Sequence, residues 1–180
     1  MRLFLAIDLP KEIRDHLFTI KDKFSKDFAK INWVAKKNIH LTLKFLGAVD
    51  DKLITKIVEK LNEINFNSFE LELDKLGVFP NLNSIRVLWV DVKNFNKVIE
   101  LQQDIEEKII NFFEKDGEFS CHITLGRVKL IKNKNEFKNI LKNLQVKNLK
   151  FRVENFTLFK SELSKDGPKY SIIQKFQAKN

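Results

Sequence analysis

The 180-residue chain carries a net charge of +9, and 43% of its residues are hydrophobic, including 17 phenylalanines. This length favours one domain, or one domain of two lobes, which can bury roughly 70% of its unfolded surface without a metal or disulfides. The single cysteine, Cys121, excludes an internal disulfide and fits a reducing cytosol. A lysine-rich excess is typical of polyanion-binding proteins and of charged surfaces generally, so a nucleic-acid partner and simple solubility both stay open.

The first predicted elements are a strand, a helix and a second strand. The apolar run at 2–9 has strand character, but it is too short for a signal peptide or membrane span, so we expect a cytoplasmic protein without a membrane contact. Apolar residues then recur every three or four positions from Ile13 to Phe28, which predicts an amphipathic helix. The stretch "NIHLTLKFLG" alternates as a strand does and stops at Gly47.

Strands and helices continue to alternate along the rest of the chain. Either Asp50 or Asp51 is expected to cap a helix whose apolar stripe runs from Leu53 to Leu61. The later predicted elements are strands at 69–79 and 84–92, a helix from Asn94 or Asn96 to about Glu114, a strand at 119–128, a helix at 136–142, and strands at 149–161 and 169–177. No linker divides the chain, so one α+β domain over 1–180 is expected, with a hint of internal duplication.

The hint of duplication comes from a repeated four-residue motif. Two of the three histidines stand in the frame His-x-Thr-Leu: His40 with Thr42, and His122 with Thr124. Random order gives this result with a chance on the order of 3 in 100,000. In a strand, each His and its Thr point to one face, about 7 Å apart at Cα. The buried opposite face is expected to carry Leu41, Leu43 and Phe45 in the first copy and Ile123 and Leu125 in the second.

Two such pairs related by a pseudo-twofold would suit the cleavage of a phosphodiester. This reaction needs a base to activate the nucleophile, an acid to protonate the leaving oxygen, and donors for the phosphoryl oxygens. Histidine has an ordinary pKa near 6.5, so it serves as either acid or base at neutral pH. Threonine hydroxyls can donate to the non-bridging oxygens. No third cysteine or histidine ligand is apparent around Cys121 and His122, so we expect no metal.

The motifs "HLTLKFLG" and "HITLGR" resemble the paired signatures of the two-histidine phosphoesterases. More narrowly, the chain is similar to the RNA 2′,3′-cyclic phosphodiesterases, also called 2′-5′ RNA ligases. The segments "RLFLAIDLP", "GVFPNLNSIRVLWV" and "FTLFKSEL…GPKY" resemble that family in the same order, so the resemblance covers nearly the whole chain. One departure is Cys121, where the family usually has proline.

The resemblance implies a bilobal α+β fold, with antiparallel sheets facing a central cleft and helices packed outside. It implies hydrolysis of RNA 2′,3′-cyclic ends to 2′-phosphates without a cofactor, and ATP-independent 2′-5′ joining as a related activity. By this resemblance His40 is the proton donor and His122 the proton acceptor, while Thr42 and Thr124 contact the phosphate. The RNA itself is left open: tRNA halves, general decay ends or a small cyclic nucleotide all fit.

Four further residues are candidates for substrate binding. Arg127 matches the family's arginine. Simple alternation places its side chain on the face opposite His122, unless a bend at Gly126 brings it back to the face of His122. Phe4 and Tyr170 are candidates for stacking a terminal base, with a core position as the alternative. By alternation Lys44 shares the face of His40 and could approach RNA phosphates.

Two other functions remain as alternatives. One is a basic RNA-binding module without catalysis, which would make the histidines dispensable. The other makes RNA ligation the main reaction; the sequence has no P-loop or nucleotide-binding lysine motif, so joining would run without ATP. A self-contained core favours a monomer in each case.

Overall fold

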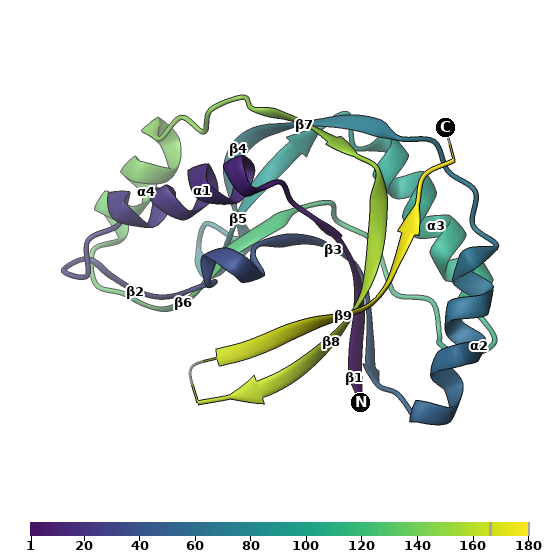
Figure 1. The fold of residues 1–180 in the computed structure, drawn as a ribbon. Helices are drawn as coiled ribbons and strands as arrows, with labels where there is room; N and C mark the ends of the chain where they lie inside the picture. Colours follow the sequence, from purple (N-terminus) through teal and green to yellow (C-terminus); the bar gives the residue numbers. More distant parts are fainter. Residues whose placement is uncertain (166, 180) are drawn as a thin grey trace.

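The computed structural model describes residues 1–165 and 167–179, and these form one curled antiparallel sheet with four α-helices outside it (Figure 1). The strands are β1 (Arg2–Asp8), β2 (Ala29–Trp33), β3 (His40–Ala48), β4 (Phe69–Asn81), β5 (Ser84–Lys93), β6 (Ile123–Ile131), β7 (Lys150–Val153), β8 (Asn155–Ser164) and β9 (Gly167–Gln177). The helices are α1 (Lys11–Thr19), α2 (Asp51–Asn62), α3 (Asn96–Ile109) and α4 (Lys134–Asn143), with short 3₁₀ turns η1 (Ile20–Lys23) and η2 (Lys36–Asn38).

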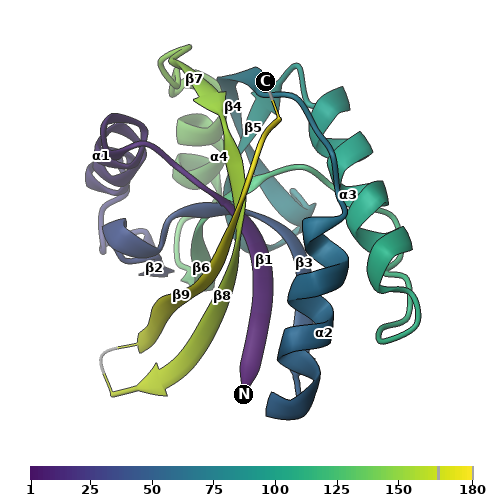
Figure 2. The same cartoon turned by 45° about the vertical axis from the view of Figure 1, so that its right-hand side comes forward.

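The sheet has two halves that join at the two motif strands. The strand order is β7-β4-β5-β6-β3-β1-β8-β9, with β2 also paired to β6. Strands β3 and β6 pair at Leu41 and Ile123, so the halves meet at the centre of the repeated motifs. Helices α2 and α3 lie on one side, and α1 and α4 on the other (Figure 2). The expected α+β architecture is confirmed, with the two expected sheets continuous as one.

The N-terminal helix is shorter than its apolar periodicity predicted. Helix α1 ends at Thr19, and the chain passes through η1 into extended backbone at Phe24. The Phe24 ring packs against Trp33 and Phe137, with centroids 5.5 and 5.3 Å away. Ile20 therefore lies in η1, and Phe24 and Phe28 lie in the loop before β2. Contacts of Phe24 with aromatic residues distant in sequence outweigh local helix propensity here.

Two later elements also differ from expectation. Helix α3 ends at Ile109 rather than near Glu114, and the following residues fold back toward β3. The strand expected at 149–161 is two strands, β7 and β8, which pair with β4 and β1 respectively. This segment therefore crosses from one half of the sheet to the other. By contrast, the cap of α2 is confirmed: the Asp50 side chain accepts a hydrogen bond from the Lys52 backbone N–H.

The core is apolar and continuous across both halves of the sheet. A second, smaller cluster of Phe4, Ala6 and Phe159, with Tyr170 packed on it, is separate from this core. In the described part of the chain, no helix is both long and apolar enough to cross a membrane.

Candidate active site

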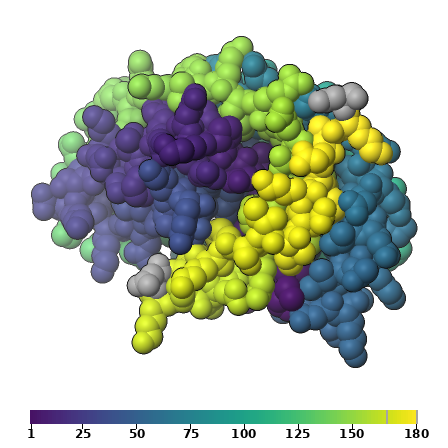
Figure 3. Space-filling view, in the orientation of Figure 1, coloured from purple at the N-terminus to yellow at the C-terminus, as the bar shows by residue number. Residues whose placement is uncertain are grey.

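A cleft of about 630 Å³ lies over the junction of the two halves, and its lining includes His40, Thr42, Thr124, Arg127 and Tyr170. Its walls come from the segment 32–38 and from the end of the β8–β9 hairpin. On the face shown in Figure 3, the yellow strand β9 passes beside the dark blue residues of this segment. The cleft therefore gathers side chains from both motifs and from the C-terminal hairpin.

The register between the motif strands places each histidine beside the other motif's threonine. Leu41 pairs with Ile123 in antiparallel register. Extending this register by one residue in each direction puts His40 opposite Thr124 and Thr42 opposite His122, at the roughly 5 Å Cα spacing of directly opposed residues. The two His-Thr pairs thus lie side by side on one sheet rather than on two facing sheets.

Both imidazoles are held by the same local hydrogen bond. The Nδ1 atom of His40 lies 2.7 Å from the Asn38 carbonyl oxygen, and that of His122 lies 2.8 Å from the Ser120 carbonyl oxygen. A carbonyl oxygen only accepts, so each Nδ1 carries the proton and donates it. In the neutral ring Nε2 is then the unprotonated nitrogen. In His40, Nε2 lies 3.0 Å from Thr42 Oγ1.

Burial lowers the pKa of both histidines. For His40 this desolvation is opposed by the hydrogen bond to the Asn38 carbonyl and by Asp8, and the charge of His122 lowers the pKa further. For His122 burial is opposed by the hydrogen bond to Ser120 and by Asp91. Each histidine therefore has one carboxylate that favours its charged form, and each is more readily neutral than a free imidazole.

Aromatic rings cause this desolvation. The ring of His40 lies 5.0 Å from that of Phe4 and 5.6 Å from that of Tyr170. The ring of His122 lies 4.9 Å from that of Phe79 and is nearly perpendicular to it. His40 is a lining residue of the cleft, and His122 packs against Phe79 and against Trp89, whose ring lies 5.9 Å from it.

The expectation that Phe4 stacks on a terminal base is wrong, because the ring is buried. The same role for Tyr170 stays a prediction. Phe4 is on the predicted face, but it is only 3% exposed and stacks on Phe159, with centroids 5.2 Å apart. It therefore supports His40 and has no free ring face for a base. Tyr170 does line the cleft, and burial raises the pKa of its phenol, which keeps the hydroxyl protonated.

A β-bulge follows the threonine of the first motif and reverses the expected faces. Strand β1 pairs Ala6 with Thr42 and Leu5 with Lys44, so Leu43 is the extra residue. A bulge shifts all later side chains to the opposite face. Phe45, expected in the core, is therefore 67% exposed and lines the cleft.

The expectation that Lys44 faces the site is wrong for the same reason. Its side chain is 1% exposed, and its Nζ atom lies 2.9 Å from Glu106 Oε1 and 3.2 Å from Asp116 Oδ2. Nζ also donates to the Glu114 carbonyl oxygen at 3.0 Å. Lys44 thus holds the segment that leads from α3 to His122, and it does not reach the cleft.

The second motif has an equivalent bulge, and this one brings Arg127 into the cleft. Strand β5 pairs Trp89 with Thr124 and Leu88 with Gly126, so Leu125 is the extra residue. Arg127 therefore points to the same side as Thr124 and lines the cleft. Gly126 serves the close approach of β2, because a Cβ there would lie 2.7 Å from Ile31 Cγ2.

Four aromatic residues near the site were assigned to the core or the buried strand face from the sequence: Trp33, Phe45, Phe79 and Trp89. Phe79 and Trp89 stack with centroids 4.8 Å apart, and both contact the ring of His122. Trp89 is the strand partner of Thr124, and this pairing between β5 and β6 brings it to the second motif. Alternation does not distinguish such residues from ordinary core aromatics.

Cys121 precedes His122 in the sequence. Burial, with a smaller contribution from Asp91, raises the pKa of the thiol to about 12, so the free thiol is protonated at neutral pH. The described residues include no group of three or more His, Cys, Asp or Glu arranged to hold a metal ion.

The comparisons with known proteins agree with the doubled motif. A family model described as "LigT like Phosphoesterase" matches twice in succession, at residues 7–89 and 90–170. The chain belongs to this family of LigT-like phosphoesterases. The two matches divide the chain between the motifs, with His40 in the first and His122 in the second.

Relatives in this family cover almost the whole chain. A protein of Methanocaldococcus jannaschii named RNA 2′,3′-cyclic phosphodiesterase is 38% identical over 98% of this chain and 100% of its own length. A Thermotoga maritima protein of the same name is 31% identical over 98% and 95%. Among solved structures, E. coli LigT complexed with 3′-AMP has a TM-score of 0.82 at 27% identity, covering 99% of this chain and 98% of its own.

Proposed function

We propose that the protein hydrolyses 2′,3′-cyclic phosphate ends of RNA to 2′-phosphomonoesters, using His40 and His122 without a metal. The observation that carries this proposal is the matched pair of imidazoles. Each has its Nδ1 atom hydrogen-bonded to the carbonyl two residues before it, which leaves Nε2 unprotonated for proton transfer, and Nε2 of His40 lies 3.0 Å from Thr42 Oγ1. The strands that carry the two motifs pair at Leu41 and Ile123. The family relatives named RNA 2′,3′-cyclic phosphodiesterase support the substrate class.

In this mechanism the two histidines act on opposite sides of phosphorus. Nε2 of His122 accepts a proton from water as the water oxygen bonds to phosphorus. The bond from phosphorus to O3′ breaks, and protonated His40 gives its proton to O3′, which leaves a 2′-phosphate and a 3′-hydroxyl. His40 has then lost one proton and His122 has gained one, and exchange with solvent restores both.

The other cleft residues stabilise the charge that develops on phosphorus. The hydroxyls of Thr42 and Thr124 donate to non-bridging oxygens, and the Arg127 guanidinium adds a fixed positive charge. Burial lowers the pKa of His40 in the free protein. A bound phosphate monoanion raises that pKa again, so substrate binding itself favours the protonated acid.

Ligation uses the same groups with a different nucleophile. A 5′-hydroxyl that replaces water would lose its proton to His122 and bond to phosphorus, while O3′ leaves with the proton of His40. The product is a 2′-5′ phosphodiester, and no ATP is consumed. Water is far more concentrated than RNA ends, so hydrolysis is the main direction.

The test is to incubate the protein with an oligonucleotide bearing a 2′,3′-cyclic phosphate. Mass spectrometry shows the addition of water on ring opening, and a 3′-specific phosphatase distinguishes a 3′-phosphate, which it removes, from a 2′-phosphate, which it leaves. We expect a 2′-phosphate and equal rates with and without EDTA. A 3′-phosphate product would contradict the assigned bond cleavage, and dependence on an added divalent ion would contradict the metal-free mechanism. Binding without turnover would favour the non-catalytic RNA-binding alternative.

A further inference from the structure

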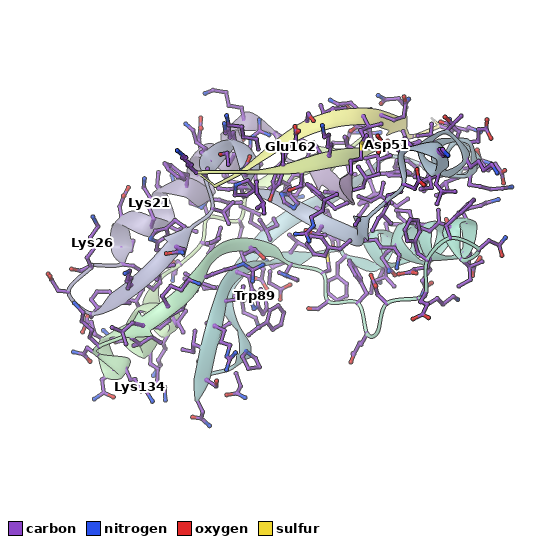
Figure 4. The ribbon with its side chains drawn as sticks, turned by 90° about the horizontal axis from the view of Figure 1, so that it is seen from below. Lys21, Lys26, Asp51, Trp89, Lys134 and Glu162 are labelled. Carbon is purple, nitrogen blue, oxygen red and sulfur yellow. The ribbon has the colours of Figure 1, made fainter. Side chains whose placement is uncertain are left out.

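A second hollow of about 690 Å³ lies between the β4–β5 hairpin and the region where β6 leads into α4. We call it the basic groove. Its lining carries five cationic side chains and, among the described residues, no Asp or Glu. The cations are Arg86, Arg127, Lys129, Lys134 and Lys138. In Figure 4, Trp89 lies near the middle of the molecule and Lys134 lies beyond it toward α4, with the hairpin alongside.

Charge pairing differs between the basic groove and the surface around Glu63. Within residues 1–165 and 167–179, none of the five forms an ion pair. By contrast, Lys60 and Lys108 both pair with Glu63 on the opposite side of the molecule. Unpaired like charges in one groove repel one another, and a polyanion that neutralises them gains counterion release.

The basic groove also presents exposed apolar side chains between its cations. Leu82 and Leu130 both line it, and each is 53% exposed. Ile85 is a third apolar lining residue. Alternating positive and apolar surface suits a single nucleic-acid strand, in which phosphates and base faces alternate.

Arg127 links the basic groove to the catalytic cleft, because it lines both. RNA that ends in a 2′,3′-cyclic phosphate extends from the cleft only in its 5′ direction. The hollow on the other side of His40 is less suitable for RNA, because Asp8 lies there and is paired with Arg14. That hollow also carries Lys37 and Lys169, so what distinguishes the basic groove from it is that no Asp or Glu is among the described residues that line the groove.

We propose that the nucleotides 5′ of the cyclic phosphate lie in the basic groove, with Arg127 at its entrance and Lys134 and Lys138 on the phosphates farther along. This inference rests on the proposed function. It makes the preferred substrate a single-stranded RNA of several nucleotides rather than a cyclic mononucleotide.

The test is the double variant Lys134→Glu/Lys138→Glu, compared with Lys52→Glu/Lys56→Glu. Both pairs are exposed lysines four residues apart on a helix, and both variants change the net charge equally. We expect the α4 variant to lower kcat/KM for an octamer with a cyclic end at least about tenfold. The slope of log kcat/KM against log salt concentration should also become shallower, by the amount that about two lost phosphate contacts contribute. The α2 variant should leave both unchanged. Neither variant should affect a 2′,3′-cyclic mononucleotide.

Two outcomes would overturn the groove: equal effects of the α2 and α4 variants on the octamer, or equal loss with octamer and mononucleotide. If wild-type protein cleaves neither substrate, the proposed function fails while the groove is still tested. Binding of a fluorescent octamer, measured by anisotropy, should then be weakened by the α4 variant and not by the α2 variant. Equal affinities would refute the groove independently of catalysis.

Discussion

The two histidines have the same local geometry but different structural support. The carbonyl that holds His40 belongs to Asn38, which is buried and donates through Nδ2 to the Pro168 carbonyl oxygen at 2.7 Å. The carbonyl that holds His122 belongs to Ser120, in the segment 110–122 that has no helix or strand. The first histidine is thus held by its own half of the sheet, and the second needs support from elsewhere.

Lys44 provides that support from the first motif's own strand. It follows Thr42 by two residues, and it binds the Glu114 carbonyl and the Asp116 carboxylate in the segment that leads to His122. The equivalent position after the second bulge is Gly126, which instead allows β2 to approach. The duplication is therefore symmetric in the local geometry of the two histidines and asymmetric in the residues that support them.

The largest expected effect comes from removing either histidine. His40→Ala and His122→Ala should each lower kcat on a cyclic-phosphate substrate by about 10² to 10⁴-fold, because each removes one proton transfer. Steady-state kinetics measures the loss, and circular dichroism checks the fold. His16→Ala is the matched control, since His16 accepts from the Lys147 backbone N–H away from the cleft. Wild-type turnover in either active-site variant would refute the two-histidine mechanism.

Lys44→Met tests the difference in support. It leaves Glu106 buried without its cation, which should lower the free energy of unfolding by about 3 to 5 kcal/mol in urea denaturation. The paired variant Lys44→Met/Glu106→Gln removes both charges and should recover much of this loss. No recovery in the double variant would show that the ion pair is not the source of the effect. In Lys44→Met, the proton transfer to His122 should also slow, while the affinity for the product nucleotide should change little.

Arg127 and Phe45 occupy equivalent positions after the two bulges, so their variants compare the two halves directly. Arg127→Ala should lower kcat/KM for a cyclic mononucleotide by about 10 to 100-fold, because a charge-assisted hydrogen bond to phosphate is lost. Phe45→Ala removes only exposed apolar surface at the cleft. It should change the same value far less. If Phe45→Ala lowered kcat/KM more than Arg127→Ala, the phosphate would not lie against Arg127 as proposed.

The smallest expected effect is on the pH dependence. Burial lowers the pKa of both histidines, so the kcat/KM optimum of the free enzyme should lie below the ordinary histidine pKa of about 6.5. The same shifts affect stability: the folded chain binds fewer protons than the unfolded chain, so the free energy of unfolding falls as pH drops from about 6.5 through the lowered values. His40→Asn should flatten part of this fall in urea titrations at several pH values. An alkaline kcat/KM optimum would contradict the lowered pKa values.

Much of the fold could be predicted from local patterns, and the errors have definite physical causes. Alternation correctly placed His40 and Thr42 together, because no bulge separates them. It failed for Lys44 and Phe45, because a one-residue bulge lies between Thr42 and both of them. The face of Phe4 was predictable from its strand, but its burial depends on Tyr170 from the far end of the chain.

The sequence by itself identified the two histidines and two threonines that we propose as the reacting groups, and it also determined their local pairing: the doubled frame specifies one His, one Thr and an apolar anchor in each copy. These are short-range consequences of strand geometry. Only the tertiary structure decided which neighbours complete the site. Leu41 meets Ile123, Arg127 returns to the cleft and Lys44 turns away from it, because strand register and bulges depend on partners that are distant in sequence.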